Sequence, residues 1–107
     1  MGKKQTRDLY VELDHQSPVS LTAAYEVVGS GPVLLMLHGF LGSSGCWRGL
    51  AEQLQAQFCC ISLDLLGFGD SAKPMIRYDV AKEVAFVRSF VESMELSNFA
   101  IVGHSFG

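Results

Sequence analysis

A chain of 107 residues, 49% hydrophobic and 18% charged, is long enough for one small globular domain but not for two. Its net charge of -3 argues against the basic surface that nucleic-acid binding requires, so we expect no nucleic-acid partner. The longest apolar run, residues 33–37, is far too short to span a bilayer, and we expect no membrane partner.

The three cysteines are Cys46, Cys59 and Cys60. Adjacent strand residues point to opposite faces of a sheet, so Cys59 and Cys60 are poorly placed to pair with each other. The spacing does not match a metal site, and we expect reduced, buried thiols in a reducing compartment. Residues 1–6 lack the apolar stretch of a secretory signal, although they match the loose myristoylation pattern. We therefore expect a cytoplasmic protein with a frayed N-terminus.

The pattern of apolar residues and turn residues predicts an alternating order of strands and helices. The expected elements are strands over 7–13, 21–28 and 33–37, a helix over 44–57, a strand over 58–63, a helix that begins after Asp79, and a strand over 99–102. The first two strands form an antiparallel pair. The unbroken apolar run over 33–37 is typical of a parallel strand buried on both faces. The fold class is therefore α/β, the N-terminal part of a mostly parallel, doubly wound sheet.

Each expected helix has apolar residues at helical spacing, which we expect to face the sheet. In the first helix these residues are Trp47, Leu50, Ala51 and Leu54. In the second helix they are Val80, Val84, Val87, Val91 and Met94, which recur at steps of four and three. Asp79 is the expected N-cap of the second helix.

The strongest indication of chemistry is Gly103-His104-Ser105-Phe106-Gly107, directly after a buried strand. It matches the pattern G-x-S-x-G, in which a sharp strand-to-helix turn lifts a nucleophilic serine clear of the sheet. Neighbouring backbone approaches so closely in such a turn that Gly103 and Gly107 have no room for side chains. The pattern predicts Ser105 as the nucleophile.

The second indication is His38-Gly39-Phe40, which follows the buried strand over 33–37. A serine that attacks a carbonyl needs hydrogen-bond donors aimed at the developing oxyanion. We expect these donors to be the backbone N–H groups of Phe40 and Phe106, with Gly39 allowing the loop to approach closely. In the architecture that the G-x-S-x-G pattern indicates, the catalytic base comes late in the chain. We therefore expect His38 to have a structural role rather than to be this base.

The third indication is the loop that begins Asp64-Leu65-Leu66-Gly67-Phe68-Gly69-Asp70-Ser71. Asp64 and Asp70 precede the serine, whereas the triad order expected here is serine, acid, histidine. We therefore expect both carboxylates to form hydrogen bonds within the loop. His104 is expected to pack against neighbours rather than act as a base.

Together the HGF, DLLGFGDS and GHSFG blocks resemble the α/β-hydrolase superfamily, over residues 21–107. The resemblance implies Ser105 as the nucleophile, Phe40 and Phe106 as the oxyanion hole, and Trp47 packed under the active-site loop. It also implies a small-molecule substrate and no metal or organic cofactor. A serine at position 105 disfavours the branches that use an aspartate nucleophile, such as haloalkane dehalogenases and epoxide hydrolases.

Family members continue beyond the nucleophile with further strands, a lid, an acid and a histidine, so we expect residues 1–107 to be the N-terminal portion of one α/β-hydrolase domain. The last strand would then have an open apolar edge, and we expect residues 1–107 alone to be poorly soluble or partly folded. The expected activity is hydrolysis of a small ester, or of a related acyl or carbon–carbon bond, through an acyl-enzyme. The alternatives are a non-catalytic fragment or binding protein and a lyase of the menaquinone-synthesis type. The sequence leaves the oligomeric state open.

Overall fold

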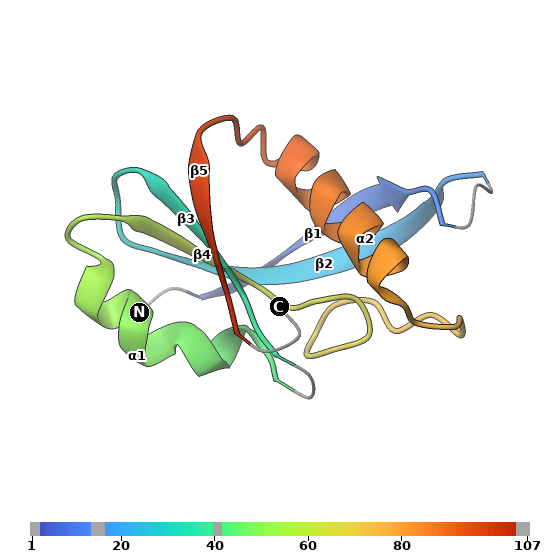
Figure 1. The fold of residues 1–107 in the computed structure, drawn as a ribbon, viewed down its shortest axis with the longest axis horizontal. Helices are drawn as coiled ribbons and strands as arrows, with labels where there is room; N and C mark the ends of the chain where they lie inside the picture. The colour runs from blue at the N-terminus through green and yellow to red at the C-terminus, as the bar shows by residue number, and fades with distance from the viewer. Residues whose placement is uncertain (1–2, 14–16, 40–41, 105–107) are drawn as a thin grey trace.

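The computed structural model describes residues 3–13, 17–39 and 42–104, and within these ranges one five-stranded sheet carries helices on both faces (Figure 1). The strands are β1 (Lys4–Val11), β2 (Val19–Val28), β3 (Val33–Leu37), β4 (Cys59–Leu63) and β5 (Phe99–Gly103). The helices are a short 3₁₀ helix η1 (Ser44–Trp47), α1 (Arg48–Leu54) and α2 (Val80–Ser93). The predicted order of elements is confirmed.

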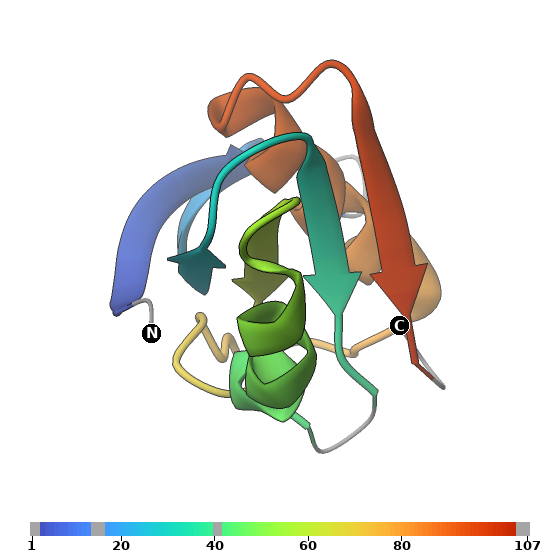
Figure 2. The same ribbon diagram turned by 90° about the vertical axis from the view of Figure 1, so that its left-hand side faces the viewer.

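The strand order in the sheet is β1-β2-β4-β3-β5. As predicted, β1 and β2 are antiparallel, whereas β3 pairs in parallel with β4 on one side and with β5 on the other. Since β4 and β5 lie on opposite sides of β3, two crossovers of the same hand place α1 and α2 on opposite faces of the sheet (Figure 2). The carboxyl ends of β3, β4 and β5 therefore meet at one edge.

The two faces of the sheet bury two separate apolar clusters. Along β3, Leu35 and Leu37 belong to the larger cluster, under α2, while Met36 belongs to the smaller cluster, which includes Ala51 of α1. Burial on both faces explains why residues 33–37 are apolar without alternation, as the sequence indicated.

The first helix is shorter and more irregular than predicted. A 3₁₀ turn precedes α1, and α1 ends at Leu54, whose carbonyl accepts the N–H groups of Gln57 and Phe58. Ala51 is buried, as expected, but Leu50 is 40% exposed, so the predicted apolar face was wrong at this position. The tight first turn changes the rotation per residue, and a pure α-helical spacing therefore misplaces the face.

Asp79 caps α2, as predicted, because its side chain accepts the backbone N–H of Lys82. The prediction that the valine stripe is the main buried face of α2 was wrong, since Val80 is 63% exposed and Val84 is 50% exposed. Phe86 and Phe90 are fully buried instead. Phe90 meets Tyr25 edge-on with ring centroids 5.1 Å apart. Aromatic side chains bury more area than valine, and they determine which side of α2 faces the sheet.

The remaining members of the predicted stripe, Val87, Val91 and Met94, are partly buried and pack at the border of the larger cluster.

Strand β5 lies at one edge of the sheet, where it pairs with β3 and has no second partner among the described strands. Ile101 is 56% exposed on this strand. The predicted open apolar edge is therefore confirmed within the part of the chain that the structure describes.

All three cysteines are free. Cys60 is buried in the smaller cluster, and Cys59 packs against the larger one on the other face, so the two adjacent thiols point apart as predicted. Cys46 is exposed, and the expectation that it is buried was wrong, because it lies on the outer side of the 3₁₀ turn. Among the described residues, no helix combines the length and apolarity needed to cross a bilayer.

Candidate active site

Two of the predicted motifs leave the sheet side by side. Gly103, the last residue of β5, is the register partner of Leu37, the last residue of β3. The N–H of His104 donates to the carbonyl of Leu37 at 3.2 Å. The segment that begins at His38 and the segment that begins at His104 therefore start from adjacent points on the same edge of the sheet.

The structure describes some of the predicted site residues and not others. Gly39 and Gly103 are described, whereas Phe40, Ser105, Phe106 and Gly107 lie outside the described residues. Ser105 as nucleophile and Phe40 and Phe106 as oxyanion donors therefore stay predictions. His104 directly follows the edge strand β5, which has no second partner among the described strands, and its side chain is exposed. The expectation that it packs against neighbours was therefore wrong.

His38 is fully buried at the end of β3, and both of its ring nitrogens are occupied. Nε2 lies 2.9 Å from the backbone nitrogen of Leu65, and Nδ1 lies 2.8 Å from the carbonyl oxygen of Gly39. An N–H can only donate and a carbonyl can only accept, so Nε2 is the acceptor and Nδ1 carries the proton. The ring of Phe68 meets the His38 ring edge-on, with the ring centroids 5.5 Å apart. This arrangement fits the structural role expected for His38.

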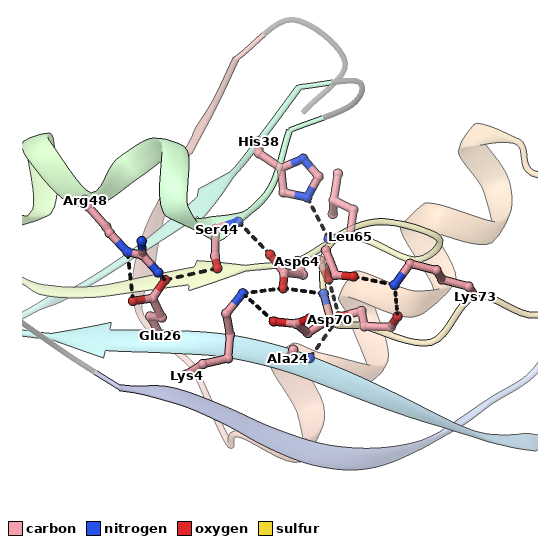
Figure 3. A network of polar contacts seen from close by, with 12 residues as sticks. Lys4, Ala24, Glu26, His38, Ser44, Arg48, Asp64, Leu65, Asp70 and Lys73 are labelled. Carbon is pink, nitrogen blue, oxygen red and sulfur yellow. Dashed lines mark hydrogen bonds and ion pairs between the residues drawn. The ribbon is translucent and has the colours of Figure 1, made fainter.

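Asp64 joins three segments of the chain through one buried carboxylate (Figure 3). It accepts the backbone N–H of Ser44 at 2.6 Å, the backbone N–H of Asp70 at 2.9 Å and the ammonium group of Lys4 at 2.6 Å. Burial opposes ionisation of Asp64, but the Lys4 ammonium and these two N–H groups outweigh it and hold the pKa of the carboxyl below its ordinary value. Asp64 is therefore an ionised side chain that holds these segments together. Its bond to the N–H of Asp70 is a hydrogen bond within the loop, as predicted.

The loop after β4 is closed around the backbone of Asp64. Ser71 Oγ donates to the Asp64 carbonyl at 2.6 Å and accepts the backbone N–H of Ala24 at 2.8 Å, which ties the loop to β2. Gly69 has φ of +55°, and a Cβ there would lie 2.4 Å from Asp64 Cγ. The glycine is thus required both by the left-handed backbone and by the close approach of the carboxylate. The Asp70 side chain is 72% exposed and lies 3.4 Å from Lys4 Nζ.

A second ion pair holds the start of the 3₁₀ helix, and the sequence analysis missed it. Glu26 is only 4% exposed, and its carboxylate accepts Ser44 Oγ at 3.2 Å and Arg48 Nη2 at 3.2 Å. A lone carboxylate in the apolar strand β2 is a pattern that could have indicated a buried polar contact. Lys4 has no such local indication, because its partner Asp64 is 60 positions away.

Beside this network, an open groove of about 400 Å³ runs along α2. Its lining includes Leu37, Leu65, Val84 and Glu83. The Glu83 carboxylate accepts the backbone N–H of Leu66 at 2.9 Å, yet burial dominates and raises the pKa of Glu83 to about 7. This acid therefore changes charge near neutral pH.

The described part of the site contains two buried carboxylates, Asp64 and Glu26, each of which is held by a cation and by hydrogen-bond donors. Within residues 3–13, 17–39 and 42–104, no three His, Cys, Asp or Glu side chains are grouped as they would be around a metal ion. The absence of a metal or organic cofactor remains an expectation from the sequence.

A sequence model of the alpha/beta hydrolase fold matches residues 32–107, which is most of the chain and includes all three motifs. The chain belongs to this family. The α/β-hydrolase family is one of enzymes, and the doubly wound sheet with its motifs at the carboxyl edge is the family's architecture. The resemblance stated from the three motifs is thereby confirmed.

The relatives of this chain include proteins that are named as hydrolases. An uncharacterised protein of Mycobacterium tuberculosis is 38% identical over 78% of the chain, and a soluble epoxide hydrolase of a Corynebacterium species is 37% identical over 78%. A solved structure titled as a membrane phospholipase A and bacterial virulence factor superposes with a TM-score of 0.80 at 32% identity, over 97% of the chain. The chain spans 25%, 29% and 32% of the length of these three proteins.

Proposed function

We propose that the protein is a serine-dependent hydrolase in which Ser105 attacks the carbonyl carbon of a small ester, or of a related acyl or carbon–carbon substrate. The observation that carries the proposal is the register pair of Leu37 and Gly103. Because of this pairing, His38 and His104 follow from adjacent points at the carboxyl edge of the sheet, which supports the proposal. A nucleophile and its oxyanion donors must leave the sheet in such a position to act on one carbonyl.

The reaction proceeds in two halves. Ser105 Oγ bonds to the carbonyl carbon as its proton passes to a histidine outside residues 1–107, and the N–H groups of Phe40 and Phe106 stabilise the oxyanion. The tetrahedral species then expels the alcohol, which takes the proton from the same histidine. Water attacks the acyl-enzyme by the same route and releases the acid and free Ser105.

The contacts of the buried His38 ring support the proposal that the catalytic base is a different residue. Its Nε2 already accepts the Leu65 N–H, and its Nδ1 donates to the Gly39 carbonyl, so neither ring nitrogen is available to take the proton of a serine. Asp64 is likewise committed to three donors, among them Lys4 and Ser44. Both groups support the architecture of the site, and the acid and histidine of the triad are proposed to lie outside residues 1–107.

The named relatives divide on the substrate. The Corynebacterium relative is named an epoxide hydrolase, and the structural neighbour is titled as a phospholipase A. A serine rather than an aspartate at position 105 favours the acyl-transfer chemistry of an ester hydrolase over the epoxide and haloalkane branches. We therefore propose a carboxylic ester, or a close relative of one, as the substrate class.

A fluorophosphonate probe tests the proposal on the protein expressed from its whole gene. The probe phosphonylates activated serines, and peptide mass spectrometry locates the modified residue. We expect labelling on Ser105 in the wild type, no labelling in Ser105→Ala, and hydrolysis of short p-nitrophenyl esters that disappears in the same variant. A folded protein that neither reacts with the probe nor hydrolyses esters would support the non-catalytic alternative. Reaction at Ser105 without ester hydrolysis would leave the lyase alternative in place.

A further inference from the structure

The side chain of Glu83 links the first turn of α2 to the loop after β4. Glu83 is only 6% exposed, and its carboxyl group accepts the backbone N–H of Leu66 at 2.9 Å. The preceding loop residue, Leu65, donates its own N–H to the ring of His38 at 2.9 Å. A single hydrogen bond from α2 therefore holds the loop that contains Asp64 and that contacts the carboxyl end of β3.

The surroundings of the Glu83 carboxyl group are mostly apolar. The Leu66 N–H is the one hydrogen-bond donor that this group has among the described residues. The group borders the groove along α2, whose other lining residues are Leu37, Leu65, Val80, Val84, Val87, Arg88 and Val91. One N–H cannot replace the water that a carboxylate loses on burial, so the charged form is unfavourable in this position.

The charged and titratable groups on α2 and just before it leave this cost uncompensated. Lys82, next to Glu83, forms an ion pair with Asp79 at 2.9 Å. Arg88 lines the groove but is exposed. The phenol of Tyr78 stays neutral near pH 7, because burial and the negative charge of Glu83 raise its pKa. Within the part of the chain that the structure describes, Glu83 therefore forms no ion pair.

Two further titratable groups belong to the loop after β4 or contact it. Asp64 stays charged through the neutral range, because the Lys4 ammonium and two backbone N–H groups outweigh burial and lower its pKa. His38 accepts the Leu65 N–H at Nε2, and a proton added there as pH falls would remove this acceptor. His38 thus loosens the loop in acid, opposite in direction to Glu83, and a substitution at position 83 separates the two effects.

We propose that Glu83 is a pH-sensitive latch between α2 and the loop after β4, closed by the protonated acid and opened into water by the ionised carboxylate. Opening hydrates the carboxylate, whereas the closed state keeps it among apolar side chains. The inference goes beyond the proposed hydrolysis and does not depend on Ser105.

The direction of the pH effect follows from the two states of the latch. Burial raises the pKa of Glu83 from 4.5 to about 7 in the closed state, while the open state returns it to its ordinary value. The closed state is therefore favoured most below pH 4.5, loses stability as pH rises to about 7, and changes little above that.

Amide hydrogen exchange at Leu66, followed by NMR in the protein from its whole gene, measures the opening of the latch. After correction for the intrinsic exchange rate, we expect the opening constant to rise by about 30- to 100-fold between pH 5 and pH 8. Glu83→Gln keeps an acceptor for Leu66 without a charge, so its opening constant should change by less than about threefold over this range. Glu92→Gln, an exposed change on the same helix, should behave as the wild type does.

A second variant tests the hydrogen bond apart from the charge. Glu83→Leu removes both the charge and the acceptor, and it leaves the buried Leu66 N–H unpaired. We expect its opening constant to exceed that of Glu83→Gln at every pH and to show no pH dependence from position 83. Equal opening constants in the two variants would overturn the role of the Leu66 bond.

The amide of Ile61 distinguishes a local latch from global unfolding. Ile61 lies in the central strand β4, where its register partners are Val27 of β2 and Leu35 of β3, so its exchange requires a wider opening. We expect its opening constant to be at least about tenfold smaller than that of Leu66. Equal constants at Leu66 and Ile61, a wild-type constant at Leu66 that does not change with pH, or the same pH dependence in Glu83→Gln would each overturn the latch.

Discussion

The backbone N–H of Ser44 donates to the buried carboxylate of Asp64 at 2.6 Å, which joins the loop after β3 to the loop after β4. Lys4 supplies the opposing charge from β1, a strand at the far edge of the sheet. The geometry of the candidate active site therefore depends on an ion pair between residues far apart in the sequence. Its consequences can be measured by removing one partner at a time.

Lys4→Met retains most of the aliphatic stem and removes the ammonium group. Because Asp64 would keep its charge with one fewer donor, we expect the free energy of unfolding at pH 7 to fall by about 1–3 kcal/mol in urea titrations. The control is Lys3→Met, because Lys3 is an exposed neighbour of Lys4. This substitution should change the free energy of unfolding by less than about 0.5 kcal/mol. Equal effects of the two variants would show that the Lys4–Asp64 pair adds nothing measurable.

The same pair predicts a pH dependence. The pKa of Asp64 is lowered in the folded state, so its contribution is present above its unfolded pKa and is lost as pH falls through the folded value. Burial lowers the pKa of Lys4, but the hydrogen bonds and negative charges of Asp64 and Asp70 together outweigh it and raise this pKa. The contribution of Lys4 to stability is therefore lost only at strongly alkaline pH. The stability difference between wild type and Lys4→Met should be constant near neutrality and shrink below about pH 4. A difference that persists unchanged in acid would contradict this assignment.

Glu83→Gln should stabilise the protein at alkaline pH. Burial raises the pKa of Glu83 from 4.5 to about 7, so the folded state binds the proton more tightly than the unfolded state and stability falls as pH rises between these values. The glutamine keeps an acceptor for the Leu66 N–H and carries no charge. We expect a gain of up to about 3 kcal/mol at pH 8 and little change at pH 4. Glu92→Gln, an exposed change on the same helix, should show no such pH dependence.

Gly69→Ala and Gly49→Ala should have opposite signs. At Gly69 the positive φ and the Asp64 carboxylate, 2.4 Å from the added Cβ, predict a loss of at least about 2 kcal/mol in chemical denaturation. At Gly49, in α1, a Cβ meets no atom within 4 Å. Alanine at this helical position should therefore raise the free energy of unfolding by up to about 1 kcal/mol. Tolerance of alanine at Gly69 would mean that the loop can close without its present contact with Asp64.

The strands could be predicted from the sequence because burial on both faces produces unbroken apolar runs such as residues 33–37. The buried face of α2 could not, since the helical spacing of valines from Val80 onwards does not show which face packs on the sheet. Packing favours the larger aromatic area of Phe86 and Phe90, which lie outside that stripe. The structural role of His38 was predicted from chain order. The Lys4–Asp64 pair was not predictable, because only the folded sheet brings β1 beside the loop after β4.

The most direct test of the central claim is a crystal structure of the protein from its whole gene after reaction with a fluorophosphonate. The account predicts phosphorus bonded to Ser105 Oγ and a phosphonyl oxygen within hydrogen-bond distance of the N–H groups of Phe40 and Phe106. Phosphorus bonded to another residue, or an oxygen directed away from both N–H groups, would contradict it.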